Sequence, residues 1–188
     1  MNIIRCSWVN EDPLYQSYHA EEWGKPIYDD RKLFELLMLE GMQAGLSWYT
    51  ILKKRDRYRE VFDGFDPAKI VHYDENKMAE LMNDAGIIRN RMKIKAIIRN
   101  AEIYMEICRE KGSFSEYVWS FVGGVPIVNH WASKADVPVT TPQSDAMSIA
   151  LKKKGMKFVG STICYAYMQA SGMVDDHTLD CFCRSKML

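Results

Sequence analysis

The chain has 188 residues, of which 47% are hydrophobic and 27% are charged, proportions typical of one globular domain with a sizeable core. Its 25 basic and 25 acidic residues give a formal net charge of zero, so any nucleic-acid partner must meet a local basic patch. No secretory signal or membrane-length apolar run is present, so we expect a cytoplasmic protein whose five cysteines are reduced.

Apolar residues recur with a helical period along most of the chain. The first helix is expected at 12–24, with Asp12 as N-cap, Pro13 in the first turn and a stop at Gly24. Further helices are expected at 30–47, 47–65, 66–73, 74–86, 91–112, 113–124, 144–155 and 159–172. Residues 123–143 carry three of the six prolines and are expected to form a long surface connection. Because no alternating segment is long enough to build a sheet, the prediction is an all-α domain.

Cysteine and histidine residues gather near both ends of the chain. The segment DDHTLDCFC at 175–183 places His177 and Cys181 four residues apart, on one face if the segment is helical. With Cys6 and His19 they would complete a closed Cys₂His₂ set, the pattern of a structural zinc site. Cys183 is a competing ligand. The spacing alone favours the alternative, in which these residues simply pack in the core.

A basic segment follows the expected tight turn GIIRN at 86–90. Between Gly86 and Asn100 the chain has five basic residues and no acidic one: Arg89, Arg91, Lys93, Lys95 and Arg99. A turn that leads into a helix start presents backbone N–H groups that suit a phosphate. A helical hairpin with a solvated basic face explains the same pattern at least as well.

Aromatic residues crowd the first fifty positions, around one carboxylate in an apolar helix. Glu40 follows LFELLML, so we expect it to be partly buried, and a buried carboxylate needs a partner or a role. Aromatic walls with one carboxylate suit a flat, cationic ligand. The alternative is an aromatic core with Glu40 at its rim. The aromatic residues concerned are Trp8, Tyr15, Tyr18, Trp23 and Trp48.

The chain resembles the bacterial 3-methyladenine DNA glycosylase I family, constitutive repair enzymes of the helix-hairpin-helix glycosylase superfamily. The resemblance rests on RCSWV at 5–9, DPLYQSYHAEEWG at 12–24, LEGMQAGLSWYTILKKR at 39–55, AGIIRNRMKIKAII at 85–98, VWSFVGG at 118–124, ALKKKGMKFVGSTICYAYMQASG at 150–172 and DDH…C ending at 181. Two departures occur: GIIRN lacks the glycine pair of the wider superfamily, and Met42 stands where a polar residue is expected.

The resemblance implies one domain over 1–188, with 76–99 as a helix-hairpin-helix and with the terminal segments 1–24 and 173–188 joined by zinc. It assigns the zinc ligands to Cys6, His19, His177 and Cys181. It makes Glu40 the catalytic and base-reading residue, with Trp8, Tyr15, Tyr18 and Trp48 completing the base pocket. It assigns DNA contacts to Gly45, Leu46, Ile88, Arg89, Asn90 and Lys93.

The implied function is removal of 3-methyladenine from double-stranded alkylated DNA in base excision repair, with the free base as product. No aspartate lies between Asp84 and Asp136, but alkylation already makes the base a cationic, good leaving group. No lysine is placed for a Schiff base, so we expect a monofunctional hydrolase that does not cut the strand. We also expect a monomer that needs no redox or nucleotide cofactor and has no membrane partner. The rival is a zinc-stapled module that binds DNA or a nucleobase without chemistry. A metallohydrolase is disfavoured because Cys₂His₂ leaves zinc no open position.

Overall fold

The computed structural model describes residues 3–184, so the outermost residues of the two predicted terminal segments lie outside the described part. Its α-helices are α1 (Pro13–Glu21), α2 (Asp30–Gln43), α3 (Trp48–Leu52), α4 (Arg55–Val61), α5 (Pro67–Ile70), α6 (Glu75–Asn83), α7 (Arg91–Lys111), α8 (Phe114–Trp119), α9 (Pro142–Lys153) and α10 (Ser161–Ala170). Short 3₁₀ turns are η1 (Asp63–Phe65), η2 (Ser120–Val122) and η3 (Lys134–Asp136), and the strands are β1 (Ile127–Val128) and β2 (Val174–Asp175). No helix in this range is both long and apolar enough to cross a bilayer.

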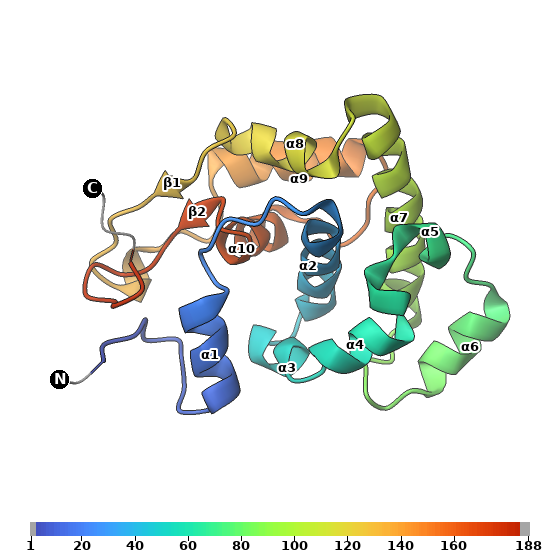
Figure 1. The fold of residues 1–188 in the computed structure, drawn as a ribbon, viewed down its shortest axis with the longest axis horizontal. Helices are drawn as coiled ribbons and strands as arrows, with labels where there is room; N and C mark the ends of the chain where they lie inside the picture. Colours follow the sequence, from blue (N-terminus) through green and yellow to red (C-terminus); the bar gives the residue numbers. More distant parts are fainter. Residues whose placement is uncertain (1–2, 185–188) are drawn as a thin grey trace.

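Helix α2 lies at the centre of the fold (Figure 1), where it packs against α3, α7, α8 and α10. Its nine residues from Leu33 to Met42 other than Glu35 are buried, which a helix surrounded by others requires. Asp29 caps its start by accepting a hydrogen bond from the Lys32 N–H at 2.8 Å. The Asp30 carboxylate accepts from backbone N–H groups at the start of α8, which ties these two helices together.

Most predicted helices are present, and the largest error concerns 47–65. The structure divides this segment into α3, α4 and η1, with a break at Lys53 and Lys54. The apolar pattern cannot locate the break, because Ile51 and Tyr58 are seven residues apart and stay in phase. A tertiary contact holds it: the Lys54 ammonium donates to carbonyl oxygens of the 84–90 turn, at 3.1 Å from that of Ala85.

Helices α6 and α7 form a hairpin at one side of the molecule (Figure 1), joined by residues 84–90. Asp84 accepts from the Gly86 N–H at 2.7 Å and binds Arg57 at 2.8 Å. A Cβ at Gly86 would lie 2.6 Å from the Arg57 Cγ, so this turn requires glycine. Asn90 then caps the 21-residue α7.

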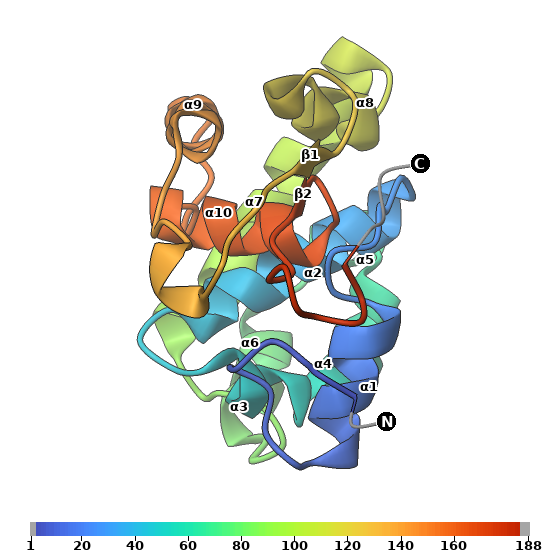
Figure 2. The same ribbon diagram turned by 90° about the vertical axis from the view of Figure 1, so that its left-hand side faces the viewer.

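The prediction of no sheet is wrong in one detail. Strands β1 and β2 form a two-residue parallel ladder that pairs Ile127 with Val174 and Val128 with Asp175. The ladder is too short to leave an alternating pattern, because it comes from the pairing of two distant loops. Figure 2 shows it beside α10, where it leads the chain toward the C-terminal loop. That loop returns to the N-terminal segment, since the Phe182 N–H donates to the Ile4 carbonyl at 3.0 Å.

Candidate active site and metal centre

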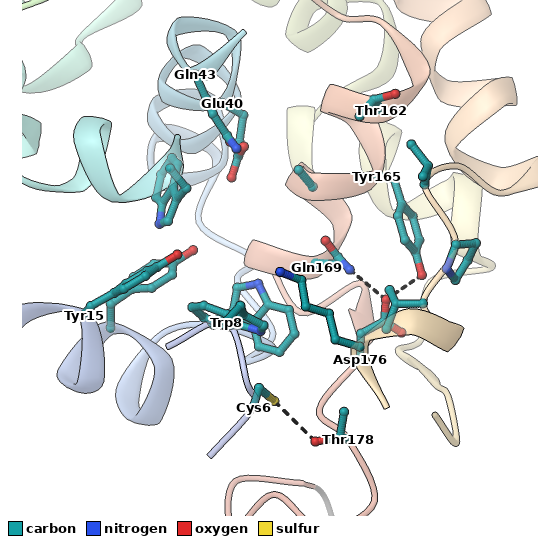
Figure 3. A pocket seen from close by; sticks show the side chains of 18 residues that line it. Cys6, Trp8, Tyr15, Glu40, Gln43, Thr162, Tyr165, Gln169, Asp176 and Thr178 are labelled. Atoms are coloured by element: carbon teal, nitrogen blue, oxygen red, sulfur yellow. Dashed lines mark hydrogen bonds between the residues drawn. The ribbon is translucent and has the colours of Figure 1, made fainter. Parts of the chain in front are cut away.

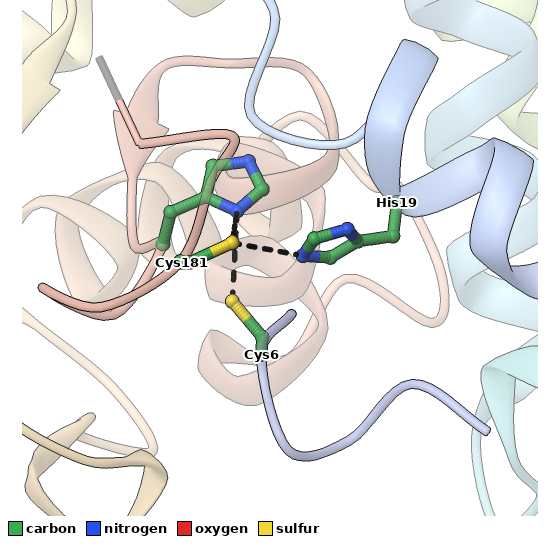
Figure 4. A group of neighbouring side chains, drawn as sticks. Cys6, His19 and Cys181 are labelled. Carbon is green, nitrogen blue, oxygen red and sulfur yellow. Dashed lines mark hydrogen bonds between the residues drawn. The ribbon is translucent and has the colours of Figure 1, made fainter. Parts of the chain in front are cut away.

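The four predicted metal ligands meet in one buried cluster (Figure 4), and their ligand atoms all lie within 4.8 Å of one another. His177 Nδ1 is 3.5 Å from Cys6 Sγ and 3.4 Å from Cys181 Sγ. His19 Nε2 is 3.4 Å from Cys181 Sγ. The cluster therefore has the donor types and separations of a four-coordinate metal site.

The local structure of 175–183 differs from the helix considered for it. His177 and Cys181 lie in an irregular loop, in which the Cys181 N–H closes a turn onto the Thr178 carbonyl at 2.9 Å. The turn still directs both side chains inward, because β2 fixes the loop's start and the Phe182–Ile4 hydrogen bond fixes its end. The four-residue spacing thus brings His177 and Cys181 together through a turn and not on one face of a helix.

The outer ring nitrogens of the two histidines also have partners. His177 Nε2 lies 3.2 Å from the Trp23 carbonyl, and His19 Nδ1 lies 3.7 Å from Cys183 Sγ. Burial, followed by the nearby His177, lowers the pKa of His19 to about 4, so its imidazole is neutral as a ligand must be. Burial raises the pKa of Cys6 to about 12, and a cation would offset that penalty on the thiolate. Cys183 faces the other nitrogen of His19 and does not belong to the group of four whose ligand atoms lie within 4.8 Å of one another.

A cavity of about 370 Å³ opens beside this cluster (Figure 3). Cys6 belongs to the cluster and also lines the cavity, and Thr178, whose hydroxyl donates to the Cys6 sulfur, lines the cavity too. The volume falls within the usual range for sites that hold small molecules. Aromatic rings from α1, α3 and the segments beside α1 line one wall, and Glu40 and Gln43 project from the α2 end. All five predicted base-pocket residues are in the lining: Trp8, Tyr15, Tyr18, Glu40 and Trp48.

Glu40 is more deeply buried than expected, with 2% of its surface exposed. Its Oε2 atom has no hydrogen-bond partner anywhere in residues 3–184. Burial raises the pKa of Glu40 from 4.5 to about 8, because the surrounding protein disfavours the charged form of the carboxyl. Two more cavity atoms, Trp48 Nε1 and Gln43 Oε1, are likewise buried and unpartnered within the described chain. Such polar atoms are costly in a finished core, so this wall is built for a polar ligand.

The rings are held by contacts with one another. Tyr18 and Trp48 have centroids 5.4 Å apart, and those of Trp8 and Tyr15 are 5.1 Å apart. Burial, and then the nearby Glu40 carboxyl, raises the pKa of Tyr18 well above its usual range. The Tyr18 hydroxyl therefore remains a hydrogen-bond donor throughout the neutral range.

The opposite wall was not predicted from the sequence. Asp176 there accepts hydrogen bonds from Asn129 and Trp131 at 2.7 Å and from Gln169 at 2.9 Å, and also from the Tyr165 hydroxyl. These four bonds join the 123–143 connection to α10 and occupy the carboxylate. The only signal for this role in the sequence was an aspartate directly before His177, a predicted metal ligand.

Part of the 123–143 connection also reaches the cavity, although it was predicted as a surface connection. Lys134, Val137, Pro138 and Val139 lie in the lining. Lys134 is exposed, and it is the only cation among the described lining residues. Sequence analysis did not identify Lys134 as a cavity residue, because the fold of a proline-rich loop cannot be read from its pattern.

The residues predicted to contact DNA fall into exposed and buried groups. Gly45 has φ +76°, with no described atom within 4 Å of a Cβ placed there, and Leu46 beside it is 45% exposed. Arg89 is exposed at the hairpin turn, and the Asn90 side chain accepts from the Lys93 N–H at 3.1 Å. The Ile88 N–H donates to the Tyr58 hydroxyl at 3.1 Å and its side chain packs on the core.

The structure corrects the prediction for Lys93 and shows where the Met42 side chain lies. The Lys93 ammonium, expected at a phosphate, is turned into the protein and donates to the Met42 and Ala44 carbonyls at 2.9 and 2.5 Å. Met42 is 2% exposed, so its side chain belongs to the core. Gln43, its neighbour, reaches the cavity from α2 together with Glu40.

Comparison with known proteins places this geometry among DNA repair enzymes. The family model for methyladenine glycosylase matches residues 8–184. DNA-3-methyladenine glycosylase 1 of Escherichia coli (strain K12) is 52% identical over 179 residues, which cover 95% of this chain and 96% of that protein. A crystal structure of 3-methyladenine DNA glycosylase I, also 52% identical, superposes with a TM-score of 0.95 over 97% of this chain and 100% of the other. The Staphylococcus aureus enzyme, solved for the structural basis of 3-methyladenine recognition, is 36% identical with a TM-score of 0.94 and covers 98% of both chains.

Proposed function

This chain belongs to the methyladenine glycosylase family and is a base-excision repair glycosylase that removes 3-methyladenine from DNA, and we propose that Glu40 is its catalytic residue. The observation that carries the proposal is the Glu40 Oε2 atom, which is buried at the aromatic end of the cavity without a partner among residues 3–184. A flipped base offers what this atom lacks, namely hydrogen-bond donors on its edge and, when methylated at N3, a positive charge.

Selectivity follows from the cost of ionising Glu40. Burial raises the pKa of Glu40 to about 8, so the carboxyl is protonated at neutral pH. Direct attraction between a cationic base and the carboxylate offsets the free-energy cost of ionising Glu40 in a buried site. Neutral adenine provides no such attraction, so it gains less from the same contacts. Trp48 and Tyr18 hold the ring by stacking, and their electron-rich faces also favour the cation.

The reaction is hydrolysis of the glycosidic bond. As the bond between C1′ and the base nitrogen breaks, its electron pair moves to the base, which leaves as neutral 3-methyladenine. A water oxygen bonds to C1′, and the water's second proton passes to solvent. The lesion's charge thus moves from the base to the sugar, and the Glu40 carboxylate near the site stabilises the cationic sugar that forms. An activated leaving group explains how the site works without a second catalytic carboxylate.

The metal cluster has a structural role in this proposal, and zinc is the ion that fits. A tetrahedral zinc with Zn–S of ~2.3 Å and Zn–N of ~2.0 Å separates nitrogen and sulfur ligands by ~3.5 Å. Three of the four N···S separations in the cluster are 3.4–3.5 Å. The ion would supply no chemistry beyond holding Cys6, His19, His177 and Cys181 together, because four protein ligands leave no open position. Its effect on the pocket is through Cys6 and Thr178, which line the cavity.

We infer that duplex DNA approaches across the α6–α7 hairpin and the exposed tip formed by Gly45 and Leu46. Support comes from the exposed Arg89 at the turn and from the start of α7, since the N-terminal end of a helix favours a phosphate. The hairpin would act as the helix-hairpin-helix element, and Leu46 would enter the gap left by the flipped base. One chain carries all these elements, so a monomer is sufficient.

The enzyme is proposed to release the base without cutting the strand. Lysines that form Schiff bases are activated by burial or by a neighbouring cation. Lys134 is exposed and has no cationic neighbour among the described residues that line the cavity. A position at the mouth of the cavity suits a contact with the DNA backbone better than attack on C1′.

The decisive experiment is incubation of the protein with methylated DNA, without added cofactor, followed by identification of the free bases. We expect release of 3-methyladenine with 7-methylguanine retained, and no covalent complex on addition of borohydride. A trapped complex that disappears in Lys134→Ala would overturn the monofunctional assignment. Folded, metal-loaded protein that releases no base would favour the binding-module alternative.

A further inference from the structure

Lys93 is an unusual lysine, because its side chain is only 7% exposed and its ammonium ends inside the fold. The Nζ atom donates to the carbonyl oxygens of Met42 at 2.9 Å and Ala44 at 2.5 Å. It also lies over the Phe158 ring, 5.9 Å from its centroid. Burial lowers the pKa of Lys93, so a lysine held here must gain enough from these contacts to offset the desolvation.

The two carbonyls are at the C-terminal end of α2, where the last turn leaves oxygens without intrahelical partners and the helix dipole is negative. From that end, residues 43–47 lead to α3. This connector joins Glu40 to Trp48, the carboxylate to the stacking ring, and carries the exposed Leu46 at its tip. The Lys93 ammonium binds one carbonyl in the last turn of α2, that of Met42, and one directly after the helix, that of Ala44. These two bonds fix the direction in which the connector leaves α2.

Lys93 itself belongs to the first turn of α7, directly after the hairpin turn. The contacts therefore bridge two parts of the fold that are 49 and 51 residues apart in sequence. One of these parts is the proposed grip on the DNA backbone, and the other forms the wall that receives the base. Within the described residues, no other side chain of α7 donates a hydrogen bond to this connector or to the Met42 carbonyl.

We propose that Lys93 is a positioning residue, which holds the 43–47 connector in fixed register with the hairpin so that a duplex bound at the hairpin presents its flipped base to Glu40 and Trp48. This role rests on the proposed glycosylase function and adds a residue to it that touches neither DNA nor base. A positioning role explains why a buried lysine directs its ammonium at two backbone carbonyl oxygens.

The test compares Lys93→Met with Lys95→Met, which removes an exposed charge from the same turn of α7. At saturating enzyme, single-turnover base release from methylated duplex is expected to slow about ten- to a hundredfold in Lys93→Met, as for other small misplacements of a reacting group. Lys95→Met is expected to stay near the wild-type rate. Equal rates in the two variants would overturn the proposal.

A second readout separates positioning from a direct phosphate contact. The salt dependence of binding to duplex with an abasic-site analogue should have the same slope in Lys93→Met as in the wild type, whereas loss of a phosphate contact lowers the slope by about 0.9. A reduced slope would overturn the proposal. Lys93→Arg, which keeps charge and donors, should recover part of the lost rate, and no recovery in a folded variant would count against the role.

Free 3-methyladenine serves as the control for folding and for the proposed function. Lys93→Met should still bind it, since Glu40 and the rings remain. Wild-type protein that neither binds nor releases 3-methyladenine would refute the function itself. Should Lys93→Met not fold, hydrogen exchange in the wild type decides, because the Leu46 N–H, bonded to the Gln43 carbonyl at 2.6 Å, must exchange as slowly as amides within α2. Exchange at the unprotected rate would overturn the proposal.

Discussion

His177 Nδ1 lies 3.5 Å from Cys6 Sγ, although 171 residues separate the two in the chain. The contact closes nearly the whole polypeptide into a loop. Because Cys6 and Thr178 also line the cavity, the same contact sets one part of the base pocket. The Cys/His cluster and the cavity are therefore structurally connected through Cys6. We expect mutations in the cluster to affect mainly stability, and mutations in the cavity to affect mainly base release.

Removal of one metal ligand should lower stability more than it alters pocket chemistry. We expect His177→Ala to lose bound zinc and about 3 kcal/mol of stability, or about 6–12 °C in Tm for a chain of this size. Metal analysis and thermal unfolding measure both. The matched control is His72→Ala, because His72 is exposed. Wild-type protein that contains no metal and melts identically with and without a chelator would contradict this prediction.

Replacement of Glu40 should abolish most base release. Glu40→Gln keeps the shape of the side chain but cannot become an anion, so we expect the single-turnover rate to fall about a hundredfold or more. Binding to DNA should change little, because Glu40 lies inside the cavity. Glu35→Gln, on the same helix and paired with Arg59, controls for loss of an acidic group from α2. An unchanged rate in Glu40→Gln would remove Glu40 from the mechanism.

The raised pKa of Glu40 predicts how stability depends on pH. Its pKa is about 8 in the folded protein against 4.5 ordinarily, so between these values the folded state holds a proton that the unfolded state has released. This contribution is present in full below about pH 4.5, is lost as pH rises toward 8, and changes by at most ~1.4 kcal/mol per pH unit. Urea unfolding at several pH values should show wild type losing stability relative to Glu40→Gln over this range. Parallel profiles would mean that Glu40 is ionised in the free protein.

The hairpin should contribute to DNA affinity through charge. Arg89 is exposed at the turn before α7, and we expect Arg89→Ala to weaken binding to duplex and to reduce the slope of log K against log salt by about 0.9. Arg109→Ala changes an exposed arginine near the opposite end of the same helix and should do neither. If the two variants behave alike, DNA does not approach across the hairpin turn.

Local patterns were sufficient where local forces decide the structure. Asp12 caps α1 by accepting from the Leu14 N–H at 2.8 Å, and Pro13 stands in the first turn, both as expected. The helix expected at 91–112 is likewise present as α7. The break within 47–65 was not, because a contact from Lys54 to the hairpin turn holds it.

The sequence by itself determined that this chain is largely helical, and its ordered blocks of residues pointed to the family and to the metal and base-pocket sets. Only the tertiary structure decided that Glu40 is buried with an oxygen that has no partner in the described part of the chain, that Asp176 braces the far wall, and that the Lys93 ammonium faces inward. Helix signals depend on neighbours within a few residues, so they are written locally. Burial, pKa and the partner of a charged group depend on segments that meet after folding, and no periodicity in the chain records them.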